Sequence, residues 1–308
     1  MSKIQHPEHM VAPQSRRSPG DFAARLDHLG ILRFDGDDAQ VFLQGQLTCD
    51  VAQVAPRSIS YGAYCNAKGR MLATFLLWRD AAGFAMALSR DLAAAVHKQL
   101  SKFVLRSKVK VSDASEATVL VGVAGAQAGH ALAETFPDAG ASLRLTDGRL
   151  LLALPAADAA GILRGIELAD AGRWRWLDIR AGVPLITAAT RDQFVPQMAN
   201  LELIGGVSFE KGCYTGQEIV ARTQHLGKVK RRMFLANVAA AAQTGDALYS
   251  DDLGDQVGGM VLNAEASPES GYDLLAVIQS ASREHSTVHL NARDGPILRF
   301  LPLPYAVA

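Results

Sequence analysis

The sequence is poor in cysteine and has no net charge. Its three cysteines, Cys49, Cys65 and Cys213, are too few and too scattered for a disulfide framework, and none belongs to a CxxC pair. We therefore expect no metal site built by this chain alone. Lysine and arginine together number 31, as do aspartate and glutamate. The whole molecule thus exerts no strong field on nucleic acid or on an anionic membrane.

Long apolar runs are also missing. The longest, such as 72–78, fall far short of the roughly 20 residues that span a bilayer, so we expect no membrane span. Residues 1–20 are polar, contain three prolines and lack the apolar core of a secretory signal. We therefore expect residues 1–20 to form a loose tail, and we expect the protein to be cytoplasmic.

Apolar residues are nevertheless plentiful, at 49% of the 308 residues, which is enough for two or three packed domains. The order strand, helix, hairpin, helix occurs twice before residue 232, and hairpin-linked strands cannot all be parallel. After 232, six short strands separated by turn residues indicate a small antiparallel barrel. We predict an α+β protein with two modules of antiparallel sheets, which need not be continuous in sequence, and a C-terminal barrel. The expected boundaries are 1–20, 21–112, 113–232 and 233–308.

The segment 200–232 carries the strongest chemical signal. Thr215 and Glu218 have the spacing of a capping box, so a helix is expected to begin there and to end at Gly227. Cys213 would then lie two residues before the cap. The positive end of a helix dipole favours a thiolate over a thiol, and Lys211 and Arg222 would act in the same direction.

Two interpretations of Cys213 compete. A lone cysteine among apolar residues is most often a buried, inert small hydrophobe. Here the glycines at 205, 206, 212 and 216 leave backbone amides free to meet an anion or a flat ligand. The polar neighbours are also hard to explain as core packing. We therefore predict an accessible, reactive thiol, with a catalytic set of Cys213, Lys211, Tyr214, Gln217 and Glu218.

The run KGCYTGQE at 211–218 resembles the signature of the YgfZ family, which is related to the aminomethyltransferase (T-protein) of the glycine cleavage system. The resemblance continues in the segments 38–48, 103–109, 192–197 and 200–201, and covers about 27–232. It implies three domains around a central opening that binds tetrahydrofolate. It also implies a cytoplasmic accessory protein that supports assembly or repair of iron–sulfur clusters and, through these, tRNA modification.

The partners implied are a reduced folate and iron–sulfur proteins or their assembly factors. We expect a monomer that binds neither membrane nor, directly, tRNA, and that is not a classical enzyme. The alternative function is tetrahydrofolate-dependent aminomethyl or one-carbon transfer.

One stretch departs from the related T-proteins, which place a pterin-binding glutamate in Leu-Arg-Leu-Glu-Ala-Gly. The similar stretch here is 177–182, where Arg180 replaces the carboxylate. A guanidinium has donors only and cannot accept the hydrogen bonds of a pterin edge. Either Asp178 substitutes for the glutamate, the pterin is held differently, or binding is weak. The candidate folate-binding residues are Asp178, Arg180, Gly206, Gly212, Gly216 and Arg222.

Two basic clusters remain. One consists of Lys228, Lys230, Arg231 and Arg232, and the other of Lys98, Lys102, Arg106, Lys108 and Lys110. Each is a dock for polyanions, such as a folate polyglutamate tail, or a solvated charged surface. The sequence leaves both interpretations open.

Overall fold

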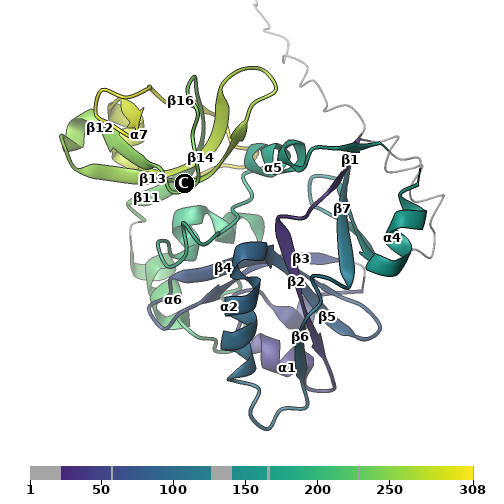
Figure 1. The fold of residues 1–308 in the computed structure, drawn as a ribbon. Helices are drawn as coiled ribbons and strands as arrows, with labels where there is room; N and C mark the ends of the chain where they lie inside the picture. Colours follow the sequence, from purple (N-terminus) through teal and green to yellow (C-terminus); the bar gives the residue numbers. More distant parts are fainter. Residues whose placement is uncertain (1–21, 57, 126–140, 165–166, 228, 308) are drawn as a thin grey trace, which may run out of the picture.

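The computed structural model describes residues 22–56, 58–125, 141–164, 167–227 and 229–307. The expected tail at 1–20 lies outside these residues, and so does 127–136, where the sequence predicts the first helix of the second strand–helix–hairpin–helix unit. The described chain forms three sheets with helices packed around them (Figure 1). This arrangement confirms the predicted α+β class.

The first sheet is antiparallel and has the strand order β3-β4-β5-β2-β6. The three- and four-residue spacing of Leu92, Val96, Leu100 and Phe103 predicts one buried helix face. Helix α2, Arg90–Ser101, buries the first three of these against the sheet. The prediction is wrong for Phe103, which lies beyond the end of the helix and is 44% exposed. The sheet also carries the shorter helices α1 and η1. The bounds are β2 Leu29–Asp35, α1 Ala39–Gln44, η1 Val51–Gln53, β3 Ile59–Cys65, β4 Met71–Arg79, β5 Gly83–Ser89 and β6 Lys110–Asp113.

The second sheet has the order β10-β1-β7-β9-β8 and is antiparallel except for the pair β1–β10. Its strand β1, Phe22–Arg25, comes just before β2 in sequence, yet β2 belongs to the first sheet. The chain therefore passes from one sheet to the other within a few residues. The other elements are β7 Thr118–Ala124, β8 Ala141–Arg144, β9 Leu150–Pro155, α4 Ala156–Ile162, β10 Leu168–Ala169 and α5 Ala171–Arg180.

The third sheet, β15-β12-β13-β14-β11-β16, is an antiparallel sheet that curls into a half barrel. Its six strands confirm the strands expected after residue 232, whereas the helix α7 was not predicted. Closure into a full barrel, and three domains about a central opening, stay predictions. The bounds are β11 Arg231–Val238, β12 Ala247–Ser250, η4 Asp251–Leu253, β13 Val257–Ala266, β14 Tyr272–Gln279, α7 Ser280–His285, β15 Val288–Leu290 and β16 Arg299–Leu301.

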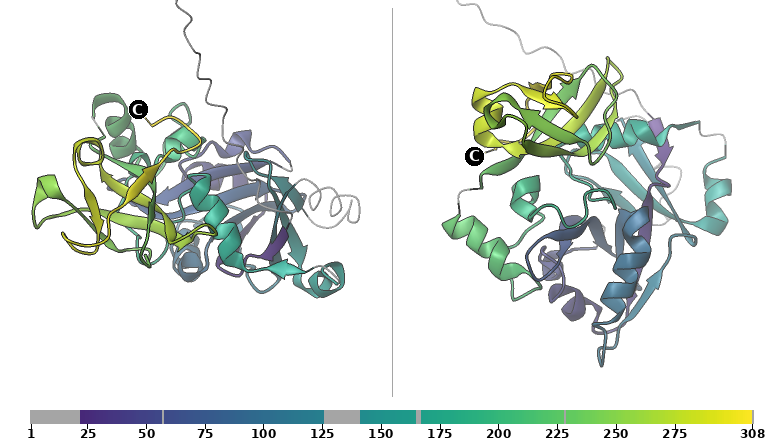
Figure 2. Two further views of the ribbon diagram at one scale, coloured as in Figure 1. Left: turned by 90° about the horizontal axis from the view of Figure 1, so that it is seen from above. Right: turned by 60° about the vertical axis from the view of Figure 1, so that its left-hand side comes forward.

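Helix α5 lies between the second and third sheets (Figures 1 and 2). Its Trp176 donates through Nε1 to Asp273 of β14 at 2.8 Å, and its Arg175 pairs with Glu265 of β13 at 2.6 Å. Trp174 on the same helix is buried against the second sheet. The helix thus fixes one sheet relative to the other.

The segment after α5 ties the first sheet to the third. The amide of Ile186 donates to Thr74 Oγ1 of β4 at 2.9 Å, while Leu185 exchanges two hydrogen bonds with Asn263 of β13. The short helices η2 Pro196–Ala199 and η3 Leu201–Ile204 follow, and then α6 Gln217–Leu226. One apolar cluster accordingly contains side chains of both sheets. No helix in the described ranges combines the length and the hydropathy needed to cross a bilayer.

His28, in the connection between β1 and β2, is expected to make the fold sensitive to acid. Its Nδ1 is buried without a hydrogen-bond partner among the described residues, and burial together with Arg175 lowers its pKa from 6.5 to about 4, against the opposing effect of Asp27. The unfolded chain therefore binds a proton at a higher pH than the folded chain, so stability falls as the pH drops from 6.5 to 4.

His28→Gln removes this titration. We expect the variant to lose about 2 kcal/mol less unfolding free energy than the parent between pH 7 and pH 5. Urea unfolding of both proteins at the two pH values measures the difference. Equal losses would show that His28 contributes nothing to acid sensitivity.

Candidate functional site

Cys213 lies on an irregular segment between η3 and α6 and is exposed, whereas Cys49 and Cys65 are buried. Burial raises the pKa of Cys49 to about 11 and that of Cys65 to about 12. A thiol reacts as its thiolate, so both buried cysteines are inert near neutral pH. Cys213 is the accessible thiol of this chain.

The start of α6 differs from the predicted capping box. The N-cap is Gly216, with a left-handed φ of 85°, and no side chain caps the helix. A Cβ at position 216 would come within 2.3 Å of the carbonyl oxygen of Asn66, in the turn between β3 and β4. This close approach selects glycine, so Thr215 is not the cap and Cys213 lies three residues before it. The predicted helix end at Gly227 is confirmed.

Lys211 points into the protein. Its Nζ donates to the carbonyl oxygens of Leu47 and Cys49 at 2.7 and 2.8 Å, and burial lowers its pKa. The ammonium also lies 5.3 Å from the ring centroid of Tyr214. Lys211 therefore anchors the Cys213 segment to the first sheet, and its expected effect on the thiol stays a prediction.

Tyr214 is the buried neighbour of Cys213, with 6% of its surface exposed. Its hydroxyl has no hydrogen-bond partner among the described residues, and burial raises its pKa. The side chain thus packs beneath the segment while the preceding thiol faces outward.

The remaining predicted residues near Cys213 separate into two groups. On α6, Glu218 and Arg222 are exposed and Gln217 is partly buried. Within the segment, the carbonyl oxygen of Gly206 accepts a hydrogen bond of 2.6 Å from Thr48 Oγ1. Gly212 is exposed, and a Cβ there would meet nothing within 4 Å. A Cβ at position 206 would come within 2.6 Å of the Leu201 side chain, so packing favours glycine at 206 and 216 but not at 212.

Asp178 lies elsewhere, on α5, where it lines an apolar slot with a cavity volume of about 40 Å³. The slot is lined by three aromatic side chains, by aliphatic ones and by Thr74; the aromatic residues are Tyr61, Phe75 and Trp174. Cys213 does not line it. The structure therefore does not bring the predicted thiol and the predicted pterin ligand into one cavity.

Arg149 holds the carboxylate of Asp178. Its Nη2 donates to Asp178 Oδ1 at 2.7 Å, its Nε donates to Asp147 Oδ2 at 2.6 Å, and its guanidinium lies 4.3 Å from the ring centroid of Trp174. Burial raises the pKa of Asp178, and Arg149 opposes that shift. Arg149 could not be recognised in the sequence, because a lone arginine after Asp147-Gly148 is typical of an ordinary hairpin turn.

Arg180 does not line the slot. It lies 3.5 Å from Asp273 Oδ2 of β14, and Asp273 is almost fully buried. Arg180 thus contacts the third sheet, and its expected role in folate binding stays a prediction. Arg232 of the basic cluster is also buried, paired with Glu202, so this residue is not part of a solvated surface.

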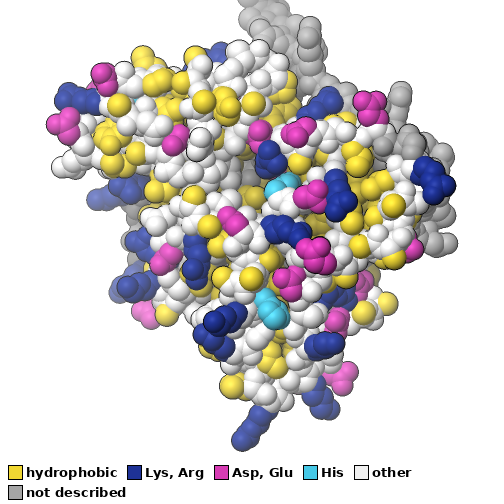
Figure 3. Space-filling view, viewed as in Figure 1, with side chains coloured by type: hydrophobic (Ala, Val, Ile, Leu, Met, Phe, Trp, Pro, Cys, Tyr) yellow, Lys and Arg dark blue, Asp and Glu magenta, His cyan; other side chains and the backbone are white. Residues whose placement is uncertain are grey.

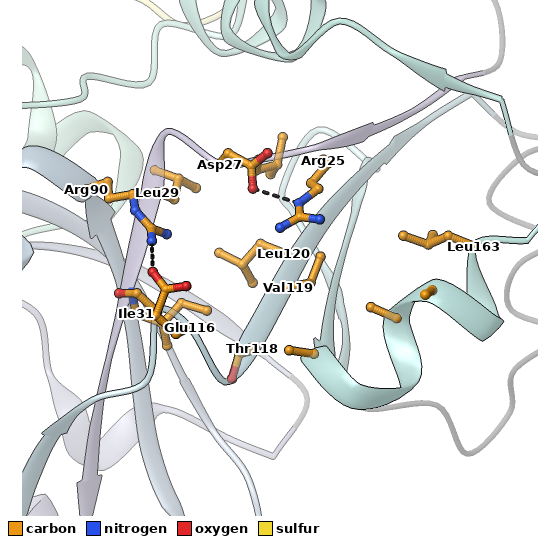
Figure 4. Close-up of a pocket in the computed structure, with 15 residues that line it drawn as sticks. Arg25, Asp27, Leu29, Ile31, Arg90, Glu116, Thr118, Val119, Leu120 and Leu163 are labelled. Atoms are coloured by element: carbon orange, nitrogen blue, oxygen red, sulfur yellow. Dashed lines mark hydrogen bonds and ion pairs between the residues drawn. The ribbon is translucent and has the colours of Figure 1, made fainter.

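A cavity of about 480 Å³ lies between the first two sheets, and none of the predicted site residues lines it. Its walls carry the ion pairs Arg25–Asp27 and Arg90–Glu116 (Figure 4). All four of these side chains are solvent-exposed. Within the described parts of the chain, no three His, Cys, Asp or Glu side chains come together as metal ligands would.

Comparison with known proteins agrees with this architecture. Residues 24–146 match the sequence model of the GCVT N-terminal domain. The structure matches that of the glycine cleavage system aminomethyltransferase T from Bartonella henselae with a TM-score of 0.69 and 17% identity, over 91% of this chain and 84% of that one.

A second match, to heterotetrameric sarcosine oxidase from Corynebacterium sp. U-96 in complex with pyrrole 2-carboxylate, has a TM-score of 0.31 and 10% identity. It covers 47% of this chain and 80% of that one, and at this score it supports no inference. The fold of this chain is that of the glycine cleavage T-protein, and its amino-terminal part contains a region that matches the GCVT N-terminal domain.

Proposed function

We propose that this protein binds a reduced folate, tetrahydrofolate, with the pterin ring in the slot at Asp178. The observation that carries the proposal is a carboxylate that lines an apolar, partly aromatic slot in a protein with the T-protein fold. A carboxylate accepts the N–H donors of an aminopterin edge, and aromatic walls pack against a flat ring. The slot, at about 40 Å³, holds little more than one water, so side chains that line it must move to admit a ring.

A second part of the proposal concerns Cys213 and its protein partners. We infer that Cys213 acts in the assembly or repair of iron–sulfur clusters, and through these in tRNA modification, with iron–sulfur proteins or their assembly factors as partners. The support is the exposed thiol on an anchored segment, within the sequence signature that resembles the YgfZ family. The protein would act in the cytoplasm as a monomer.

The rival function is tetrahydrofolate-dependent aminomethyl transfer, and the structurally similar protein is named as an aminomethyltransferase. One observation favours binding without turnover. Among the residues that line the slot, Asp178 is the one carboxylate, and Arg149 already holds it at 2.7 Å. A general base must be free to take a proton from the substrate.

Asp178→Asn is expected to weaken tetrahydrofolate binding roughly 10- to 100-fold, because a hydrogen bond to a charged acceptor contributes about 1.5–3 kcal/mol. Asp147→Asn is the matched control, since it removes the other carboxylate partner of Arg149 but does not line the slot. Both variants should lower the melting temperature to a similar extent, and only the first should lose affinity.

Calorimetric titration, with melting curves of both variants, measures these quantities. The same preparation, supplied with an aminomethyl donor, is assayed for methylenetetrahydrofolate. Equal affinity of the Asp178 variant and the parent would remove Asp178 from the folate site, and product formation would establish the rival function.

A further inference from the structure

Three apolar side chains are exposed at the end of the molecule formed by α1 and the loop that follows α2. The exposed fraction is 87% for Leu105, 44% for Phe103 and 75% for Val41. Val104, between the first two, packs against the core instead. The loop thus turns one side chain inward and presents the two that flank it to solvent.

Leu105 also has an unusual backbone. Its φ is 44°, in the left-handed region that costs a non-glycine residue of order 1 kcal/mol or more. Hydrogen bonds of the flanking backbone, including Ser107 N to Val104 O at 2.8 Å and Lys108 N to Asp38 Oδ2 at 2.7 Å, fix this conformation. The loop therefore holds the leucine outward in a strained conformation although its side chain gains no burial within this chain.

Cations surround these side chains. Five exposed basic residues come from α2, the loop and β6, and none of them forms an ion pair with a described carboxylate; they are Lys98, Lys102, Arg106, Lys108 and Lys110. Three carboxylates lie at the start of α1 and the end of β2: Asp38 accepts from the Lys108 amide, Asp35 pairs with Arg33, and Asp37 is exposed, so the five cations outnumber them. Dark-blue side chains accordingly predominate at the lower tip of the molecule, with apolar atoms between them (Figure 3). This positive charge is a local feature of the tip, because the whole chain has a net charge of zero.

We propose that this tip, made of Val41 and the loop 102–109 with its flanking lysines, is a docking surface for an acidic protein. A central apolar side chain inside a charged rim is the arrangement of a protein interface, where the apolar centre supplies affinity and the rim supplies orientation. Leu105 would enter an apolar pocket whose rim carries carboxylates. Its strained, fixed conformation means that little order is lost on binding.

Nucleic acid and membrane fit the tip less well. Single-stranded nucleic acid is held by several stacked aromatic rings, whereas Phe103 is the one aromatic among the three exposed apolar side chains. Stable attachment to a bilayer requires a longer apolar face than three side chains on a loop and a short helix. An aliphatic side chain held rigidly outward is instead suited to a preformed pocket.

The test begins with a photo-crosslinking amino acid at position 105 of the full-length protein, expressed in its native cells. We expect one prominent acidic protein to be crosslinked, and the same residue at position 297, on the distant third sheet and 61% exposed, not to capture it. The captured protein is then purified and titrated with the unmodified chain, where saturable binding that weakens with salt is expected.

Four variants identify the surface in that titration. Leu105→Asp and Arg106→Glu should each weaken binding roughly tenfold or more, whereas Ile297→Asp should leave it unchanged. Leu105→Gly should weaken binding as well, while its melting temperature stays equal or rises, because glycine adopts a φ of 44° without strain. Loss of binding without loss of stability separates docking from folding.

Several outcomes would overturn the proposal. They are the absence of a specific crosslink at position 105, unchanged affinity of Leu105→Asp for the purified partner, and a partner that is not acidic. Binding of the tip to phosphatidylserine-containing vesicles or to an RNA oligonucleotide, lost in Leu105→Asp, would assign the surface to one of those ligands instead. Tetrahydrofolate binding should not change in any of these variants, so this test is independent of the folate proposal.

Discussion

Replacing Gly216 by alanine is expected to lower the unfolding free energy by about 2–4 kcal/mol and to displace the Cys213 segment. Two costs add here, since alanine is strained at the φ of 85° and its Cβ would lie 2.3 Å from the carbonyl oxygen of Asn66. That carbonyl belongs to the turn between β3 and β4 and accepts the amide of Gly69. Neither backbone can move without breaking the turn or the start of α6.

Gly212→Ala is the control for this change. It lies in the same segment, one residue before Cys213, but its φ is not positive and an added Cβ meets no atom within 4 Å. Urea unfolding should therefore show a change of no more than about 0.5 kcal/mol. If the two variants are equally stable, the close contact with Asn66 does not determine the residue at 216.

Cys213→Ser is expected to abolish the support of iron–sulfur enzymes in cells that lack the native protein, while stability and tetrahydrofolate affinity stay unchanged. The side chain is exposed and lines no part of the slot, so neither core packing nor a pterin contact is lost. What changes is the chemistry, because a serine hydroxyl is a far weaker nucleophile and metal ligand than a cysteine thiol. Activities of iron–sulfur enzymes in extracts measure the effect.

Alkylation of the folded protein tests the thiol itself. Iodoacetamide should add one label per folded chain, at Cys213, and should reach Cys49 and Cys65 only after unfolding, because both are buried and their pKa values are raised to about 11 and 12. Glu210→Gln, an exposed change in the same segment, serves as the control with full cellular activity. Full activity of the serine variant would exclude the thiol from the mechanism.

The sequence determined those features that short stretches of chain specify. The hairpin of β3 and β4 follows from two β-rich runs around a turn whose Gly69 has a φ of 69°, and the buried face of α2 follows from its apolar spacing. The six strands after 232 and the end of α6 at Gly227 were found for the same reason. Apolar periodicity and turn chemistry act over a few residues, so they can be read without knowing the fold.

Contacts between distant segments were decided only by the tertiary structure. Nothing near β1 in sequence shows that it pairs with β7 while β2 joins the other sheet. The cap of α6 is a glycine because of a carbonyl in another hairpin, and Asp178 is held by an arginine from the turn between β8 and β9. Lys211 turns inward because the carbonyl oxygens of Leu47 and Cys49 accept hydrogen bonds from its buried ammonium. A buried charge without such partners would be costly. Each outcome depends on which polar and apolar groups are buried together, and that burial exists only once the sheets have packed.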